Sequence, residues 1–219
     1  MNSAVIQLLV LAGIAVFLIL RLKNVLGTRE GFEKPQVQAS SAQTRARPEL
    51  EVIEGGPDRD ITDHVEDGSD SAKALAAMKM AEPGFSVSEF LTGARQAYEM
   101  IFSAFESGDI SDVRGFLGPD VAEAFDAVIA ERKEKGLVID SEIVGVRDVE
   151  LRRATFDRDT REGQVTVRFL AELTTVVRDA EGTVVEGDPN EIKRQHDTWT
   201  FGRPMGTDDP NWQLVATGE

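Results

Sequence analysis

The sequence predicts an α+β domain that follows a single transmembrane helix. Three features of the apolar pattern support this fold class. An uncharged apolar run occupies residues 4–20, apolar residues recur at helical spacing over residues 85–136, and from Leu137 onward they alternate with polar residues. Helices that precede consecutive antiparallel strands are typical of α+β proteins. Long strands with three helices on one face further suggest a cone-shaped half-barrel.

The apolar run Ala4–Leu20 contains one polar residue, Gln7, and no charge. A helix that rises about 1.5 Å per residue would span roughly 25 Å here, close to a hydrocarbon core of about 30 Å. Arg21 and Lys23 follow the run and no cation precedes it, whereas a cleaved signal peptide carries its cations ahead of the run. The charge order favours an uncleaved single-pass anchor with a periplasmic N-terminus and a cytoplasmic remainder.

The pattern divides the chain into an anchor segment (1–26), a flexible acidic linker (27–84) and a C-terminal domain (85–219). Nine acidic residues against one basic residue occupy positions 49–70 of the linker, which leaves little apolar area to bury. This segment is either an arm that finds partners or a solvated spacer. Residues 71–80 fit a weak amphipathic helix with Met80 on its apolar face, at a membrane surface or partner, or a short lead-in helix.

The first domain helix should begin at Ser86, because Ser86 and Glu89 have the spacing of a capping box. Apolar residues then recur at steps of three and four from Phe90 to Phe105, which predicts a wide buried face. Gly108 is expected to end this helix.

Two further helices are predicted before the strands. A short one should cover residues 110–117, and a longer one should begin at Pro119 and end at Gly136. The residues of the longer helix expected to face inward are Val121, Ala124, Phe125, Val128 and Ile129.

The alternating region predicts five strands, with a bend near Gly145 and a tight hairpin link at residues 179–182. The expected strands are Leu137–Ala154, Gln164–Arg178, Thr183–Glu186, Glu191–Phe201 and Trp212–Thr217.

Composition restricts the chemistry that the chain can perform. The chain has no cysteine, two histidines and a net charge of −15. These values exclude disulfides, thiolate zinc sites and multi-histidine metal sites, and they disfavour nucleic-acid binding. No glycine-rich nucleotide loop is present. His196 and Asp197 form the one adjacent pair of catalytic type, but neighbours in a strand point to opposite faces. We therefore expect no catalytic residue, metal or cofactor.

The aromatic residues of the domain are the candidate binding residues. They would either line a hydrophobic pocket for a partner's apolar segment or a lipid tail, or fill the core between helices and sheet. Trp199 and Trp212 lie on neighbouring predicted strands and, if paired, would fix the register of the last strand. The candidate residues are Tyr98, Phe102, Phe105, Phe116, Phe125, Trp199 and Trp212.

Four segments carry a family resemblance. These are residues 21–31 (RLKNVLGTREG), 90–109 (FLTGARQAYEMIFSAFESGD), 199–203 (WTFGR) and 209–216 (DPNWQLVA). They resemble bacterial, alphaproteobacterial homologues of subunit forty-four, the scaffold subunit of the presequence translocase of the mitochondrial inner membrane. This chain differs from the mitochondrial pattern because a spanning helix replaces the presequence and the long basic region.

The resemblance implies a cone-like fold similar to nuclear transport factor two and a non-enzymatic adaptor of the inner membrane. Its expected partners are inner-membrane proteins or a chaperone, with the bilayer contacted through residues 4–20. The alternatives are a cone that binds a lipid or small hydrophobic ligand, an isomerase or dehydratase of the same shape, and a ribosome-tethering factor. The last relies on arginines clustered between residues 147 and 161.

Overall fold

The computed structural model describes residues 57–218. The predicted anchor and residues 27–56 of the predicted linker lie outside this range. Within it, no helix combines the length and the apolar character that crossing a bilayer requires.

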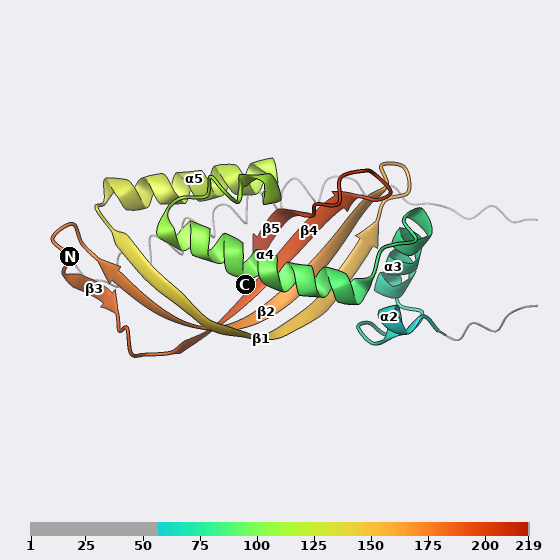
Figure 1. Ribbon diagram of the computed structural model, residues 1–219, viewed down its shortest axis with the longest axis horizontal. Coiled ribbons are helices and arrows are strands. Elements are labelled where there is room, and N and C mark those ends of the chain that lie inside the picture. Colours follow the sequence, from blue (N-terminus) through green and yellow to red (C-terminus); the bar gives the residue numbers. More distant parts are fainter. Residues whose placement is uncertain (1–56, 219) are drawn as a thin grey trace, which may run out of the picture. The chain divides into compact units, whose positions relative to one another are not determined.

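A curved antiparallel sheet forms one layer of the folded unit (Figure 1). The strands are β1 (Val138–Phe156), β2 (Glu162–Arg178), β3 (Val184–Gly187), β4 (Lys193–Pro204) and β5 (Gln213–Gly218). They follow the order β1-β2-β4-β5, and the short β3 pairs with the end of β2. The α+β prediction is confirmed, and all five predicted strands form close to their expected bounds.

The predicted bend in the first strand is also present. The pairing of β1 with β2 shifts register at three places, between Ile143 and Gly145, Val146 and Asp148, and Leu151 and Arg153. Each irregularity increases the local twist, so the long β1–β2 hairpin curves and leaves a concave face.

Two long helices cover the concave face of the sheet, α4 (Val87–Ser107) and α5 (Pro119–Glu134) (Figure 1). The Ser86 hydroxyl accepts a hydrogen bond from the Glu89 N–H at 3.3 Å, and Gly108 ends α4 with a φ of 77°. Residues with a side chain rarely adopt this left-handed conformation, which explains why a glycine ends the helix.

The predicted helix over residues 110–117 is wrong. One 3-10 turn, η1 (Arg114–Phe116), forms there, and Ile110 and Val113 are nevertheless buried. Gly115 and Gly118 have a low helix propensity, and α5 already begins at Pro119, so the turn does not extend into a helix.

The inward face of α5 also differs from the prediction at one position. Val121 and Ile129 are buried as expected, but Val128 is exposed and Ala122 takes a buried place instead. The buried face of α5 is therefore rotated about the helix axis, toward Ala122 and away from Val128.

The core lies between α4 and the concave face of the sheet. The ring of Tyr98 in α4 is stacked on Phe169 of β2 with the centroids 4.5 Å apart, and Trp199 of β4 packs against it at 4.7 Å. All three side chains are buried. Burial of each aromatic ring contributes about 1.5–3 kcal/mol, so this packing is a large part of what holds the helix on the sheet.

The folded unit begins before the predicted boundary at Phe85. Two helices, α2 (Arg59–Thr62) and α3 (Asp70–Ala81), lie inside the predicted linker, and Leu75 and Met78 of α3 are fully buried. α3 matches the short helix expected over residues 71–80, but the acidic composition of its surroundings placed it in the linker. Met80, expected on the apolar face, is instead 86% exposed.

Asp60 joins α2 to the start of α4. Its carboxylate accepts hydrogen bonds from the backbone N–H groups of Val87 at 2.8 Å and Ser88 at 2.9 Å, and Lys79 lies 2.8 Å away. Burial alone would raise the pKa of Asp60, but the bonds from Lys79, Ser88 and Val87 outweigh it and hold that pKa well below its usual range. Asp60 thus caps a helix 27 residues further along the chain.

A second charged contact joins the end of α3 to β4. The guanidinium of Arg203, which is 5% exposed, donates to the Glu82 carboxylate at 2.6 Å and to the carbonyl of Asp209 at 3.0 Å. Glu82 also accepts the Gly206 N–H at 2.8 Å. Burial would raise the pKa of Glu82, yet these donors lower it, so the carboxylate stays charged. The N-terminal helices are therefore fixed at two points, α2 to the start of α4 and the end of α3 to β4.

Replacing Asp60 with Asn should destabilise the folded unit by about 1–3 kcal/mol, because a charged acceptor of two helix N–H groups is lost. In the parent chain this stabilisation is present above about pH 4, the pKa of an unfolded aspartate, and is lost as the pH falls toward the lower folded value. Urea unfolding followed by tryptophan fluorescence at neutral and acid pH would measure both effects.

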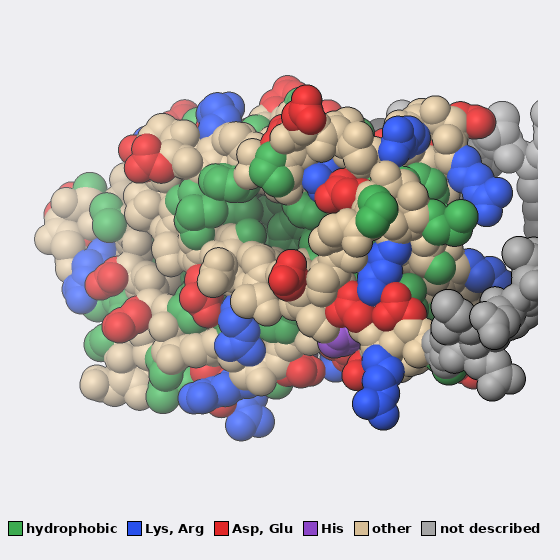
Figure 2. Space-filling model, turned by 45° about the vertical axis from the view of Figure 1, so that its right-hand side comes forward, with side chains coloured by type: hydrophobic (Ala, Val, Ile, Leu, Met, Phe, Trp, Pro, Cys, Tyr) green, Lys and Arg blue, Asp and Glu red, His purple; other side chains and the backbone are tan. Residues whose placement is uncertain are grey.

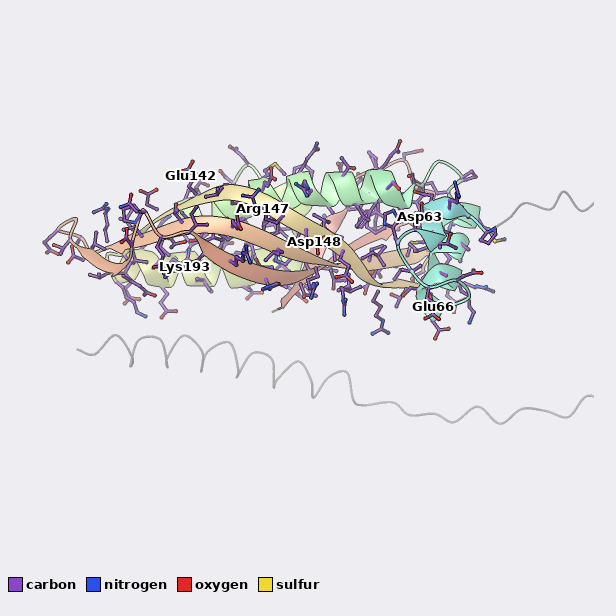
Figure 3. The ribbon with its side chains drawn as sticks, turned by 90° about the horizontal axis from the view of Figure 1, so that it is seen from below. Asp63, Glu66, Glu142, Arg147, Asp148 and Lys193 are labelled. Carbon is purple, nitrogen blue, oxygen red and sulfur yellow. The ribbon has the colours of Figure 1, made fainter. Side chains whose placement is uncertain are left out.

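Asp63, which is labelled in Figure 3, provides the matched control, because it lies in the same segment and its side chain is exposed. The Asp63→Asn change should leave the unfolding midpoint unchanged. Equal effects of the two substitutions would contradict the capping role of Asp60.

Candidate functional site

The seven predicted aromatic residues do not form one binding site. Tyr98, Phe102 and Trp199 are buried in the core, whereas Phe105, Phe116, Phe125 and Trp212 are partly buried and pack against it. The three buried rings belong to the central stack beneath α4. The partly buried ones lie where the core meets the surface.

Trp212 forms a separate cluster at the start of α4. Its ring packs edge-on against Phe90 with the centroids 4.7 Å apart, and the Arg203 guanidinium lies 5.3 Å from its centroid. The predicted pairing of Trp199 with Trp212 is wrong, because Thr217 is the register partner of Trp199 and Trp212 precedes β5. Trp212 therefore supports the Arg203 contact.

Phe105 and Phe125 join α4 to α5. Their centroids are 4.3 Å apart, and the guanidinium of Arg132 lies 4.4 Å from the Phe105 centroid. Phe116 of η1 is partly buried and packs against the core. These rings are mainly packing between helices, although hydrophobic side chains do gather in a hollow of the face seen in Figure 2.

A pocket of about 630 Å³ opens on the sheet beyond the central stack. Its floor is formed by Leu173, Thr175 and Val177 of β2, and its walls by β3 and the first half of β4. In the β2–β4 register Leu173 faces Lys193, and Phe169 faces Asp197. Side chains of these residues therefore share the concave face of the sheet.

A hydrogen-bonded chain connects the pocket wall to the aromatic core. The hydroxyl of Tyr98 donates to Asp197 at 2.6 Å, and the side-chain amide of Gln195 lies 2.9 Å from the same oxygen. Burial and the bond to Asp197 raise the pKa of Tyr98 far above its ordinary value. The phenol thus stays protonated and acts as a donor that orients the carboxylate.

A second polar group borders the pocket at the C-terminal end of α4. The hydroxyl of Ser141 lies 3.0 Å from the Glu106 carboxylate and 2.9 Å from the hydroxyl of Thr175. Arg132 of α5 reaches the other oxygen of Glu106 at 3.3 Å. This group reaches the pocket through Thr175, whereas the lining itself comes from β2, β3 and β4 and combines an apolar floor with a polar border.

His196 borders the pocket, but its side chain does not point into it. It is exposed and faces Leu170 in the register, so its side chain points to the convex face, opposite to that of Asp197. Across residues 57–218, no group of His, Asp or Glu side chains is placed to hold a metal ion.

Sequence reasoning named His196 and Asp197 as a candidate pair but missed the other residues that line the pocket, chiefly Gln195 and Leu173. The alternation along β4 contained a usable signal, because Gln195 and Asp197 are in phase with Trp199, a predicted inward residue. Gln195 is polar, so it does not belong to the aromatic set from which the candidate binding residues were chosen.

A comparison with protein families matches residues 71–219 to the Tim44-like domain. The chain belongs to the Tim44-like family. The match begins inside α3, so the Tim44-like domain includes a helix that the sequence pattern assigned to the linker. It also includes the whole pocket and the central aromatic stack.

The Tim44-like chain is similar to two mitochondrial proteins. It is 25% identical over 168 residues to the human mitochondrial import inner membrane translocase subunit TIM44, covering 72% of this chain and 36% of that protein. It is 20% identical over 152 residues to subunit TIM44-1 of Arabidopsis thaliana, covering 67% and 32%. The chain therefore spans about a third of the length of these relatives.

Among solved structures, the intermembrane space region of the chloroplast protein ARC6 is similar at 14% identity. The match covers 60% of this chain and 92% of that one, with a TM-score of 0.39.

Tyr98 is the one tyrosine of the chain, so its ionisation can be followed alone. We expect no phenolate absorbance to develop between about pH 9 and 11, where a free tyrosine ionises, until alkali unfolds the domain. Ultraviolet absorbance and circular dichroism recorded in one titration would check this. Ionisation of Tyr98 in a domain that is still folded would contradict the buried Tyr98–Asp197 bond.

Proposed function

We propose that this protein is a non-enzymatic adaptor of the bacterial inner membrane that docks partner proteins on the concave side of its Tim44-like domain. The observation that carries the proposal is the Tim44-like domain itself, with a pocket whose apolar floor has a polar border. Such a surface suits an apolar segment of a partner, whose flanking polar groups would meet Asp197, Gln195 or Lys193.

The relatives support a role linked to a translocase, since their names place them at the mitochondrial inner membrane in protein import. In this proposal the partners are inner-membrane proteins under assembly or a chaperone. Residues 4–20 hold the protein in the bilayer, with the N-terminus periplasmic and the domain cytoplasmic. Because the match covers about a third of each relative, their other segments have no counterpart in this proposal.

The proposed tether is shorter than the sequence pattern suggested, because the folded unit includes α2. Residues 27–56 remain between anchor and domain, and a coil of that length has a root-mean-square reach of roughly 30 Å. A reach this short keeps the domain close to the bilayer and raises its effective concentration for partners in the same membrane.

The geometry of the pocket supports a role without catalysis. Asp197 in its wall accepts a hydrogen bond from Tyr98 of the core, and the raised pKa of the phenol makes Tyr98 a poor acid or base near neutral pH. His196, the other candidate, is turned to the opposite face of the sheet. The polar groups of the pocket are thus suited to orientation and recognition.

A small hydrophobic ligand is the second candidate occupant. The pocket volume of about 630 Å³ lies within the range of ligand sites, and Leu173 and Val177 form its apolar floor. Native mass spectrometry of the purified protein would detect a bound lipid. A stoichiometric ligand, together with unchanged capture of proteins by pocket variants, would favour this candidate over the adaptor.

Replacing Thr175 with Lys should reduce the capture of protein partners several-fold, because it places a long cation in the pocket floor. In-membrane cross-linking followed by mass spectrometry would measure this. Thr174→Lys is the matched control, since adjacent strand residues point to opposite faces and Thr174 lies on the convex one. Equal capture by both variants would contradict docking in the pocket.

Removal of residues 4–20 should abolish capture of membrane partners while leaving the domain folded. Carbonate extraction of membranes would establish whether the parent chain is integral. A parent chain that is released by this treatment would contradict the anchor in the proposal.

A further inference from the structure

The outer edge of β1 is covered along its second half and open along its first. Arg95 of α4 donates to the carbonyl of Val146 at 2.8 Å, and the Ser71 hydroxyl of α3 accepts the N–H of Ala154 at 3.1 Å. Across the residues that the structure describes, no group bonds to the outer side of the backbone at residues 138–145. An unpaired strand edge offers a ready template for another strand.

The register shows which backbone groups of this open half face outward. The carbonyl of Thr175 in β2 is directed toward β3, because a Cβ atom at Gly187 would overlap it. Ser141 lies directly opposite Thr175, so the backbone groups of Ser141 point away from β2. Ile139 and Ile143 have the same phase as Ser141. The N–H and carbonyl groups of these three residues therefore face outward in a row.

A groove separates this edge from α4. Its volume is about 450 Å³, and it is lined by Glu99 and Ser103 of α4 and by residues 141–145 of β1. The side chain of Ser141 lies on this concave side of the sheet, where it contacts Glu106. The groove therefore has room for the side chains that an added strand would direct toward α4.

The convex side of the same edge has two acidic side chains between two apolar ones. In chain order they are Val138, which is 60% exposed, Asp140, Glu142 and Val144, which is 46% exposed. The ion pairs of this region join other residues, because Arg147 binds Glu172 at 2.6 Å and Arg132 binds Glu106. The carboxylates beside the edge are thus available to the cations of a partner.

The two acidic residues disfavour a second copy of this chain as the occupant. If two β1 edges paired antiparallel about Ser141, Asp140 of one copy would lie opposite Glu142 of the other. Like charges directly opposite each other destabilise a strand pair, whereas opposite charges stabilise it. The charge of the edge therefore points to a partner strand that carries Lys or Arg at these positions.

We propose that the open half of β1 accepts a basic, extended segment of a partner protein as an added strand. Backbone hydrogen bonds to residues 139–143 supply affinity, and cations opposite Asp140 and Glu142 supply selectivity. This surface is separate from the pocket, because β2 lies between it and the walls formed by β3 and β4. Figure 3 shows Glu142 and Lys193 toward opposite margins of the sheet.

A fluorescent peptide of sequence Val-Thr-Lys-Thr-Lys-Thr-Val tests the proposal with the full-length chain in detergent. When extended, its valines and lysines share one face and match the apolar and acidic order of the convex side. We expect saturable binding in fluorescence anisotropy. The peptide with glutamates in place of both lysines should bind several-fold more weakly, because it places like charges opposite each other.

Backbone methylation of the peptide separates strand addition from simple charge attraction. The threonines lie opposite Ile139, Ser141 and Ile143, so their N–H groups face the edge. N-methylation of the threonines should abolish binding although the charge of the peptide is unchanged. N-methylation of the two lysines, whose N–H groups face solvent, is the matched control and should leave binding intact.

Hydrogen exchange and charge reversal in the chain locate the site. The amides of Ile139, Ser141 and Ile143 should exchange rapidly in the free chain and become protected by the peptide. Glu142→Lys should weaken binding several-fold. Asp148→Lys, at an exposed position on the covered half of the same strand, makes the same charge change and should not.

Failure of the peptide to bind, equal effects of the two methylations or equal effects of the two substitutions would overturn the proposal. So would protection of the edge amides before any peptide is added, because residues of the chain itself would then fill the edge. Partner capture through the pocket is measured separately with the variants at positions 174 and 175, so each proposal can fail without the other.

Discussion

The stacking of Tyr98 on Phe169 and Trp199 is the interaction on which the rest of the structure depends. It holds α4 against two strands that are distant in sequence, and it closes one end of the concave face while leaving the other end open as a pocket. The hydroxyl of Tyr98 also donates a hydrogen bond to Asp197 in the pocket wall. Core packing and the wall of the pocket therefore both depend on Tyr98.

The acidic character of the N-terminal part of the folded unit has a structural use. Asp60 and Glu82 are both carboxylates whose negative charge is matched, the first by helix N–H groups and Lys79, the second by Arg203. Buried charges are tolerated where several donors surround them, which explains why a segment with few apolar residues is folded. Composition by itself describes such a segment as a spacer.

Much of the Tim44-like domain could be predicted from the sequence because its local signals are strong. The capping residues of α4, the glycine at its end and the alternation in β2 are properties of short stretches, and the structure confirms each. The errors have long-range causes. The burial of Met78, the role of Asp60 and the placement of Trp212 depend on partners far away in the sequence. The pocket was missed because its lining residues come from three different strands, β2, β3 and β4.

The attachment of α2 through Asp60 also decides how the domain would respond to tension. A pull applied to the chain ahead of Pro57 acts first on the bonds of Asp60 to Val87 and Ser88, and only later on the ion pair of Glu82 with Arg203. In this geometry the force acts on the contacts one after another and not on all of them at once. The sheet would stay intact while α2 and then α3 detach from it.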